Sequence, residues 1–282
     1  MILTPDSRPA RGIRGTGSLF PIVFIVFLLA SPACRKAGDT GTTLTIAGST
    51  SVQPFAEKLA ETYMGTHPGL AINVQGGGST AGVRAAETGA AQIGMSSRHL
   101  KDTEQALHQV TIALDGIAII VNAGNPVAGL TRAEVASIFA GEIPRWNRIG
   151  GPDRPIHFVT REEGSGTRGA FEEMVMGKKE IAPRALVQDS NGAVREIVAS
   201  DPDALGYISL GLVDRRVRSV AVDGVLPTHE TILAKRYGVV RPFLFLTREE
   251  PAGAARAFID YVLGPEGQRL LGLEGLIPVV QP

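Results

Sequence analysis

The chain is predicted to have an α/β fold, because short apolar, strand-like runs alternate along it with glycine-rich loops and with helical patterns of apolar residues. Three loops rich in Gly, Ser and Thr, at residues 48–51, 76–80 and 164–167, each lie between a predicted strand and a predicted helix. The composition agrees, since 34 glycines and 18 prolines in 282 residues suit many short connections, and a 44% hydrophobic content suffices for one large or two modest domains. In such folds the binding site forms from loops at the carboxyl ends of the strands.

The first predicted elements surround the first two of these loops. A strand at residues 44–47 leads into a helix whose apolar residues recur at helical spacing, with a proline tolerated in its first turn. The residues that carry this pattern are Val52, Pro54, Phe55, Leu59 and Tyr63. A second strand at 71–74, a short helix at 83–88 closed by Gly89, and a third strand at 93–95 follow.

The second part of the chain repeats this alternation. Residues 116–122 are almost entirely apolar and too few to span a membrane, which predicts a buried strand. Thr131 and Glu134 match a capping box, so a helix is expected to start there and to run through Phe139. Further strands are expected at 156–160, 206–210 and 243–247, and further helices at 169–175, 191–200, 252–263 and 265–271.

The N-terminal segment predicts export from the cytoplasm. Three arginines precede an uncharged apolar run at residues 19–30, and small residues then lead to Cys34, the single cysteine. Residues 1–33 are therefore expected to be a signal peptide, and residues 34–42 a polar tether. The position of the cysteine resembles a bacterial lipoprotein processing site, although such sites usually carry Leu where Ser31 stands. We expect lipidation of the cysteine, with ordinary signal cleavage as the alternative, because no second cysteine exists to form a disulfide.

The charge balance and the residue types exclude several function classes. Lys+Arg and Asp+Glu both number 28, so the net charge is zero, and aromatic residues make up only 5% of the chain. The sequence therefore offers neither the basic surface nor the stacking platforms that nucleic-acid binding needs. Its five histidines are scattered and show no metal-ligand spacing, so neither a metal nor a cofactor is expected.

The segment at residues 161–168 carries the strongest functional signal. It places two glycines, two hydroxyl side chains and two arginines between a predicted strand and a predicted helix. Free backbone N–H groups and the dipole at the start of a helix favour an anion there. One such loop is most often only a turn or a helix cap. Because three of them occupy the same topological position, the pattern predicts a single oxyanion held between several helix starts.

Familiar nucleotide-binding and hydrolase motifs fit this segment poorly. Residues 164–169 match G-x-G-x-x-G, but three polar residues separate the strand from the first glycine, and side chains fill the loop where a dinucleotide needs close backbone approach. No glycine loop is followed by a Walker lysine with its Ser or Thr. Neither Ser165 nor Ser79 has the flanking glycines of a nucleophile elbow, and no histidine lies near either loop, so serine hydrolysis is not expected.

Seven motifs follow one another in a recognisable order. They are residues 44–54 (LTIAGSTSVQP), 73–79 (NVQGGGS), 93–98 (IGMSSR), 161–168 (REEGSGTR), 191–194 (NGAV), 206–210 (GYISL) and 265–268 (PEGQ). This series resembles the phosphate-binding proteins of bacterial phosphate ABC transporters over about residues 43–280. The resemblance implies a type II periplasmic-binding-protein fold, in which two crossover strands form the hinge between two lobes. One lobe would hold residues 43–117 together with 243–282, and the other residues 118–242.

The resemblance also implies which residues bind the ligand. A dehydrated phosphate would be held by backbone N–H groups, hydroxyls and one arginine, which together match the lone pairs and the charge of a tetrahedral anion. The implied binding residues are Thr50, Ser51, Ser79, Ser97, Arg161, Ser165, Gly166 and Thr167. Glu163 stands where relatives have an acid that pairs with the site arginine. Ser97 stands where well-characterised relatives have an aspartate that accepts the proton of hydrogenphosphate, so Asp115 and Glu163 are candidate substitute acceptors.

By this resemblance the chain is an exported, lipid-anchored receptor in the periplasm or at the outer face of the cell membrane. It would capture inorganic phosphate in a cleft between the lobes and deliver it to the permease and ATPase subunits of an ABC transporter, without being an enzyme. Two alternatives stay open. In the first, the receptor binds another tetrahedral oxyanion, such as sulfate or molybdate. In the second, the same anion-binding loops belong to a phosphatase, although the sequence shows no Ser–His pair and no metal cluster for that activity.

Overall fold

The computed structural model describes residues 42–279, and it confirms the predicted α/β fold within that range. Cys34 and the predicted signal peptide lie outside the described residues. The strands of the main sheet are β1 (Thr42–Gly48), β2 (Leu70–Gly76), β3 (Ile93–Ser96), β4 (His108–Asn122), β6 (His157–Arg161), β7 (Leu186–Gln188), β8 (Ala204–Ser209), β9 (Val217–Ser219), β11 (Val240–Thr247) and β12 (Ile277–Pro278). A small second sheet pairs β5 (Gly129–Leu130) with β10 (Ala221–Val222).

Helices separate most of these strands. The α-helices are α1 (Gln53–Thr66), α2 (Ser79–Thr88), α3 (Arg132–Phe139), α4 (Gly166–Phe171), α5 (Asn191–Ser200), α6 (His229–Leu233), α7 (Gly253–Leu263) and α8 (Pro265–Leu273). Short 3₁₀ turns are η1 (Asp102–Glu104), η2 (Trp146–Ile149) and η4 (Leu210–Leu212), and η3 (Glu172–Met176) is one turn of π-helix that continues α4. No helix in the range 42–279 is long and apolar enough to cross a membrane.

The main sheet is parallel toward both ends and antiparallel in its middle. Its strand order is β2-β1-β3-β11-β4-β8-β6-β7, with β9 and β12 also pairing with β4. The strands β2, β1 and β3 are parallel, as are β8, β6 and β7, whereas β11 and β4 run antiparallel to each other and to their outer neighbours. Each parallel set directs its carboxyl ends, and hence its Gly/Ser/Thr loops, to one edge.

Two large hydrophobic cores lie on different parts of this sheet. One core draws on β1, α1, β3, α7 and α8, and its members include Ile46, Phe55 and Phe258. The other draws on α3, β6, α4 and β8, and its members include Phe139 and Tyr207. We call these two parts lobe 1 and lobe 2. Each lobe therefore buries its own apolar surface, which is what an independently packed domain requires.

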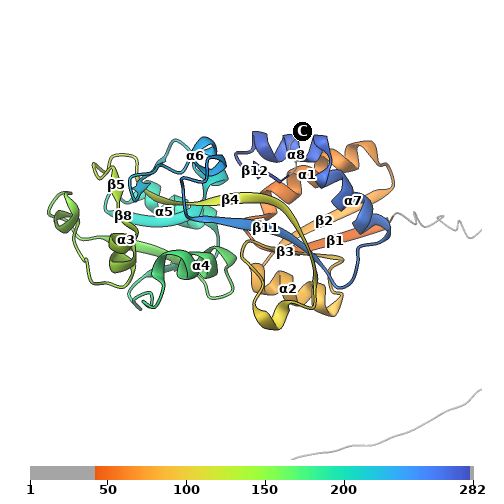
Figure 1. Ribbon diagram of the computed structural model, residues 1–282, viewed down its shortest axis with the longest axis horizontal. Helices are drawn as coiled ribbons and strands as arrows, with labels where there is room; N and C mark the ends of the chain where they lie inside the picture. Colours follow the sequence, from red (N-terminus) through yellow and green to blue (C-terminus); the bar gives the residue numbers. More distant parts are fainter. Residues whose placement is uncertain (1–41, 280–282) are drawn as a thin grey trace, which may run out of the picture. The chain divides into compact units, whose positions relative to one another are not determined.

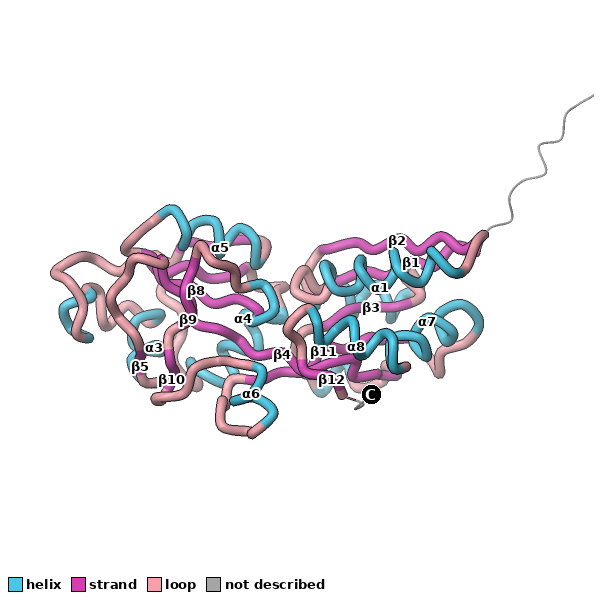
Figure 2. Tube along the Cα trace, turned by 90° about the horizontal axis from the view of Figure 1, so that it is seen from above, coloured by secondary structure: helices cyan, strands magenta, loops and turns pink. Residues whose placement is uncertain are grey.

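Strands β4 and β11 pass from one core to the other. In β4, Ala113 belongs to the core of lobe 1 and Ile117 to that of lobe 2. In the chain that enters β11, Val239 belongs to lobe 2 and Phe243 to lobe 1. Figures 1 and 2 show the two strands side by side between α1, α7 and α8 on one side and α3 and α5 on the other. The lobe boundaries at 117/118 and 242/243 stay a prediction.

Several elements differ from their predicted extents for physical reasons. The strand expected at 116–122 begins earlier, at His108, because its first half pairs with β11 and carries polar residues that hide the apolar pattern. The helix expected at 83–88 begins at Ser79, directly after the glycine loop. The helix expected at 169–175 begins at Gly166, where the Ser165 hydroxyl accepts from the Arg168 N–H and caps it.

Candidate functional site

The three Gly/Ser/Thr loops meet between the lobes. The Ser51 hydroxyl, after β1, lies 2.7 Å from the Thr167 hydroxyl at the start of α4. The N–H of Thr80, in α2, donates to the carbonyl oxygen of Gly164 at 3.2 Å. These bonds join elements far apart in the sequence. The first two loops follow strands of lobe 1, and the third follows a strand of lobe 2. The loops that the sequence singled out one by one therefore form one constellation.

A cluster of buried serines forms the floor of this constellation. The Ser49 hydroxyl donates to the Ser97 hydroxyl at 2.8 Å, and the Ser97 N–H donates to the Ser79 hydroxyl at 3.0 Å. The backbone of Gly166, from lobe 2, approaches closely: a Cβ there would lie 2.1 Å from Ser79 Oγ and 2.5 Å from Ser97 Oγ. Only glycine fits at that position, so the backbone of lobe 2 packs directly on the hydroxyls of lobe 1.

Arg161 is fixed at the end of β6 with its side chain buried, at 1% exposure. Its Nη2 donates to the Thr50 hydroxyl at 2.9 Å and to the Asp189 carbonyl oxygen at 2.9 Å. Its Nε donates to the Gln188 carbonyl oxygen at 3.2 Å. Its Nη1 is buried and has no hydrogen-bond partner among the described residues. Because an unpaired buried donor is costly, and more so on a charged group, this nitrogen points to a ligand that accepts hydrogen bonds.

The acid that pairs with Arg161 is Glu162, and the expectation that Glu163 would do so is wrong. Glu162 accepts from Nε and from Nη2 of the arginine, each at 3.0 Å. A turn closed by the Ser165 N–H and the Glu162 carbonyl oxygen carries Glu163 to another place. There it lines a pocket of about 340 Å³ whose wall also includes Lys101.

Asp115 is engaged by protein partners, which argues against its role as a substitute acceptor for a ligand proton. Its Oδ2 accepts from Nε and Nη2 of Arg241 at 3.0 and 2.9 Å, and its Oδ1 accepts from the Ser209 hydroxyl at 2.8 Å. Burial raises the pKa of this carboxyl, while the charge of Arg241 and the hydroxyl of Ser209 oppose the rise. Both oxygens thus already have donors.

Three further residues join the constellation that the sequence did not single out as binding residues. Asn191, at the start of α5, donates from Nδ2 to the Ser51 hydroxyl at 2.8 Å. Ser49 and Arg241 contact the loop of Ser97 from two sides. Asn191 stands in a quoted motif and Ser49 in the first loop, so a local signal existed for both. Arg241 has no such signal, because only the pairing of distant strands brings it here.

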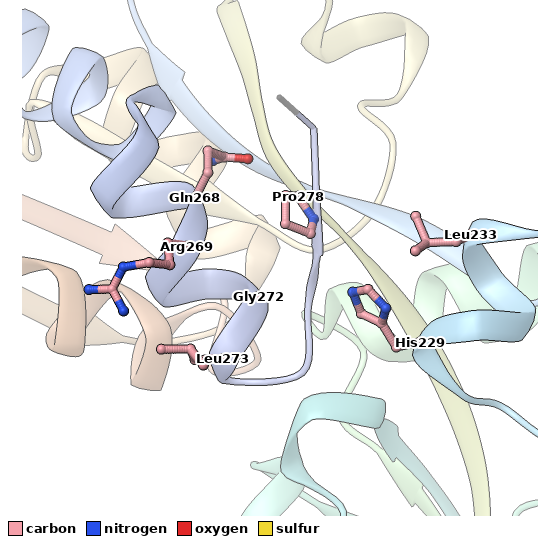
Figure 3. Close-up of a pocket in the computed structure, with 7 residues that line it drawn as sticks. All are labelled: His229, Leu233, Gln268, Arg269, Gly272, Leu273 and Pro278. Atoms are coloured by element: carbon pink, nitrogen blue, oxygen red, sulfur yellow. The ribbon is translucent and has the colours of Figure 1, made fainter. Parts of the chain in front are cut away.

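The pocket in Figure 3 lies apart from this constellation. It lies between α6 and α8, has a volume of about 440 Å³, and shares no lining residue with the Gly/Ser/Thr loops. It is lined by His229, Leu233, Gln268, Arg269, Gly272, Leu273 and Pro278. Within residues 42–279, no group of three or more His, Cys, Asp or Glu side chains is placed to hold a metal ion.

Comparisons with known proteins show the family of this chain. The model of the PBP superfamily domain matches residues 35–266. The phosphate-binding protein PstS of Bacillus subtilis is 31% identical over 278 residues, which cover 92% of this chain and 92% of the relative. One solved structure, with bound phosphate, is 42% identical to this chain. It is that of a substrate-binding protein from Clostridium perfringens that is assigned to a phosphate ABC transporter. It has a TM-score of 0.82 and covers 85% of this chain and 100% of its own. An ABC-type phosphate transport receptor from Vibrio cholerae is 39% identical, with a TM-score of 0.71 and coverage of 84% and 100%.

The two-lobed α/β fold and the constellation between its lobes define a solute-binding protein of the periplasmic-binding-protein class. The chain belongs to the PBP superfamily and, within it, to the extracytoplasmic phosphate-binding proteins of phosphate ABC transporters. Proteins of this family bind a solute for transport and are not enzymes, so the phosphatase alternative is set aside.

Proposed function

We propose that this protein captures inorganic phosphate between its two lobes and delivers it to the permease and ATPase subunits of an ABC transporter. The observation that carries the proposal is Arg161 Nη1, a buried charged donor without a partner among residues 42–279, which lies beside loops rich in hydroxyls. A tetrahedral oxyanion supplies both the acceptor and the negative charge that this guanidinium lacks. The names of the relatives agree with phosphate as that anion.

The proposed binding residues come from both lobes. Lobe 1 contributes hydroxyls and backbone N–H groups from Thr50, Ser51, Ser79 and Ser97. Lobe 2 contributes Arg161, Ser165, Gly166 and Thr167. Neutral donors surround the anion while the arginine balances its charge, a combination that holds a desolvated oxyanion without a metal ion. Closure of lobe 1 (residues 43–117 and 243–282) on lobe 2 (residues 118–242) would complete the shell of donors.

The nature of the anion depends on carboxylates near the loops. Glu162 is paired with Arg161 and Asp115 with Arg241. Ser97, the residue that the family resemblance places at the proton acceptor, offers only a hydroxyl. We propose phosphate as the ligand because the relatives are phosphate-binding proteins. A hydroxyl can donate to an unprotonated oxygen or accept from a protonated one, so sulfate should be a measurable competitor.

The experiment that tests the function is calorimetric titration of the purified protein with phosphate. Wild type should bind it, and Arg161→Ala should lose roughly 2–5 kcal/mol of binding free energy because the buried anion loses its charge partner. Arg148→Ala, an exposed arginine on η2, is the matched control and should bind like wild type. Thermal melts without ligand establish that both variants fold. A loss below about tenfold, or 1.4 kcal/mol, for a folded Arg161→Ala would place the site elsewhere.

The membrane anchor is a separate part of the proposal. It rests on the sequence alone, where a charged start, an apolar run and small residues precede Cys34. Cleavage before this cysteine and its acylation would hold the receptor at the membrane. Cys34→Ala should release the protein or block its processing in membrane fractionation. Mass spectrometry that finds an unmodified mature N-terminus would contradict the anchor while leaving phosphate binding untouched.

A further inference from the structure

An ion pair joins the two strands at the place where they cross between the lobes. Asp115 on β4 and Arg241 on β11 are direct partners in the antiparallel register. Asp115 lies between Ala113 and Ile117, where β4 changes from one core to the other. The carboxylate accepts two bonds from the guanidinium, at 2.9 and 3.0 Å, and each residue is only 1% exposed.

The remaining bonds of this pair reach residues of both lobes. Toward lobe 1, Arg241 Nη1 donates to the carbonyl oxygen of Ser97 at 3.1 Å. Toward lobe 2, Asp115 Oδ1 accepts from the Ser209 hydroxyl at 2.8 Å, and the Ser209 N–H donates to Asn191 Oδ1 at 3.1 Å. Asn191 in turn donates to the hydroxyl of Ser51 at 2.8 Å. A continuous chain of buried hydrogen bonds thus runs from Ser97 through the crossing strands to Ser51.

Stability alone explains this pair poorly. Removing two charges from water costs about as much as their attraction returns, so a buried ion pair usually adds little net stability compared with apolar side chains. This pair does provide a fixed geometry, since Nε and Nη2 of Arg241 both donate to Oδ2 of Asp115. The remaining atoms, Asp115 Oδ1 and Arg241 Nη1, are held by their own hydrogen bonds. Burial lowers the pKa of Arg241, while the charge of Asp115 and its hydrogen bonds oppose the shift.

We infer that Asp115 and Arg241 are positioning residues for the anion site, which fix the Ser97 loop of lobe 1 and the Ser209–Asn191 segment of lobe 2 in the arrangement that binds the anion. The inference rests on the proposed phosphate function. By this inference the crossing strands do more than connect the lobes, because they fix the positions of the two halves of the site relative to each other.

Asp115→Asn separates this role from a purely electrostatic one, because the two predict opposite signs. If Asp115 acted only through its charge, the amide would remove a negative charge near the anion and strengthen phosphate binding. As a positioning residue, its replacement disrupts the bond network and should weaken phosphate binding about five- to hundredfold, the range for a disrupted buried hydrogen bond. Unchanged or tighter binding by the folded variant would overturn the inference.

Asn122→Ala is the control for general destabilisation. Asn122 ends β4, and its Nδ2 donates to the carbonyl oxygens of Val198 and Ala199, near the end of α5, at 3.1 and 2.8 Å. None of these bonds involves a proposed phosphate ligand. The control should lose stability and keep phosphate affinity within about twofold, that is within about 0.4 kcal/mol. Equal losses of phosphate affinity in Asn122→Ala and Asp115→Asn would show that general destabilisation causes the effect, and would overturn the inference.

A milder variant tests the inference if Asp115→Asn does not fold. Ser209→Ala removes one hydroxyl from Asp115 Oδ1 and leaves the ion pair in place. It should weaken phosphate binding several-fold, and binding equal to wild type would contradict the proposed network. Titration of wild type with inorganic phosphate separates the two proposals. No binding by wild type refutes the proposed function itself, whereas binding by wild type with no loss in either variant refutes only the positioning role.

Discussion

Two neighbouring carboxylates follow Arg161, and their surroundings differ. Glu162 holds the guanidinium through two bonds of 3.0 Å, whereas Glu163 lines the pocket beside Lys101. The position of Arg161 also depends on Thr50 and on two backbone carbonyl oxygens, so Glu162 is one of several contacts. At this residue the charge of the carboxylate, which opposes a bound anion, is therefore expected to outweigh its contribution to geometry.

Glu162→Gln should strengthen phosphate binding by roughly two- to tenfold. The amide oxygen still accepts from the guanidinium, while the negative charge near the anion is gone. The effect stays small because the Glu162 side chain is 33% exposed and solvent screens its charge. Glu163→Gln, the matched control, should have a smaller effect in the same calorimetric titration. Weaker binding by Glu162→Gln would show that the geometry of the carboxylate, and not its charge, controls Arg161.

At the residue scale the sequence locates the hydroxyls that lie together in the structure, but not the side chains that hold their neighbours in place. Ser51, Ser79 and Thr167 follow strand ends in Gly-rich loops, a local pattern that is readable without a structure. The pairing of Arg161 with Glu162 depends on how the chain turns after β6, which the sequence does not specify. Arg241 stands in an apolar strand and looks like an isolated charge until β4 is placed beside it.

Helix caps connect the residue scale to the elements. Thr131 caps α3 by accepting from the Glu134 N–H at 3.1 Å, as its capping box predicts. Ser165 caps α4 by accepting from the Arg168 N–H at 3.2 Å, and it is also a proposed anion ligand. One cap thus stabilises an element alone, while the other is expected to serve both the element and the site.

Thr131→Ala should lower the free energy of unfolding by about 1 kcal/mol and leave phosphate affinity unchanged. Ser165→Ala should lower it by at least as much and should weaken phosphate binding as well, because a donor to the anion is removed. Denaturant unfolding without phosphate gives the first quantity and calorimetry the second. If the two variants bind phosphate equally, Ser165 acts only as a cap.

The Arg98–Glu104 pair connects the loop after β3 to η1, and it makes that element sensitive to acid. The hydrogen bonds from Arg98 hold the pKa of the Glu104 carboxyl below its ordinary value, although burial opposes them. A carboxyl whose pKa is lowered by folding stabilises the protein above its unfolded pKa. This contribution is lost as the pH falls through the lowered value.

Glu104→Gln should therefore be less stable than wild type near neutral pH, and the two stability curves should converge in acid. Glu61→Gln, an exposed position on α1, is the control and should follow the wild-type curve. Denaturant midpoints measured between neutral pH and about pH 3 test this. A difference between wild type and Glu104→Gln that does not shrink in acid would contradict the assigned pair.

Elements with strong periodic patterns and caps were predicted closely, and others were not. The helix α5 has the predicted bounds, because its apolar residues repeat at helical spacing. Strand β7 has three residues and helix α6 five, too few for a periodic signal. The first half of β4 was missed because its polar residues interrupt the apolar pattern. Its backbone is a strand because it pairs with β11, a distant part of the chain.

At the scale of the whole molecule, the proposed binding site draws on two lobes and on the strands between them. No lobe holds the full set of proposed ligands, since Ser79 and Ser97 belong to lobe 1, and Arg161 and Thr167 to lobe 2. Ligand binding should thus stabilise the folded, closed arrangement, because only that state assembles all donors. The resemblance to a family predicted this architecture, whereas the local patterns alone predicted only an α/β fold.

Phosphate should raise the melting temperature of wild type by roughly 5–10 °C at a concentration near a hundred times its Kd. Binding adds about 2.7 kcal/mol at that ratio, and each kcal/mol shifts the melting temperature of a chain of this size by about 2–4 °C. Arg161→Ala should show about a third of that shift or less at the same concentration, because a loss of 2–5 kcal/mol leaves about 0.9 kcal/mol of stabilisation at most. Differential scanning calorimetry of both proteins, with matched ionic strength, measures the effect. A phosphate shift of wild-type size in the variant would contradict the placement of the site.

Sulfate binding distinguishes a site that accepts any tetrahedral oxyanion from one that requires a protonated oxygen. Because Ser97 offers a hydroxyl and both Asp115 and Glu162 are paired with arginines, an unprotonated oxygen meets little repulsion, and sulfate should also raise the wild-type melting temperature. Its shift should be smaller than that of phosphate. Ser97→Asp introduces a carboxylate that accepts the proton of hydrogenphosphate but repels sulfate, so this variant should keep the phosphate shift and lose the sulfate shift. If sulfate does not raise the melting temperature of wild type, a group other than Ser97 accepts the proton of hydrogenphosphate. The hydroxyl cluster then does not determine selectivity.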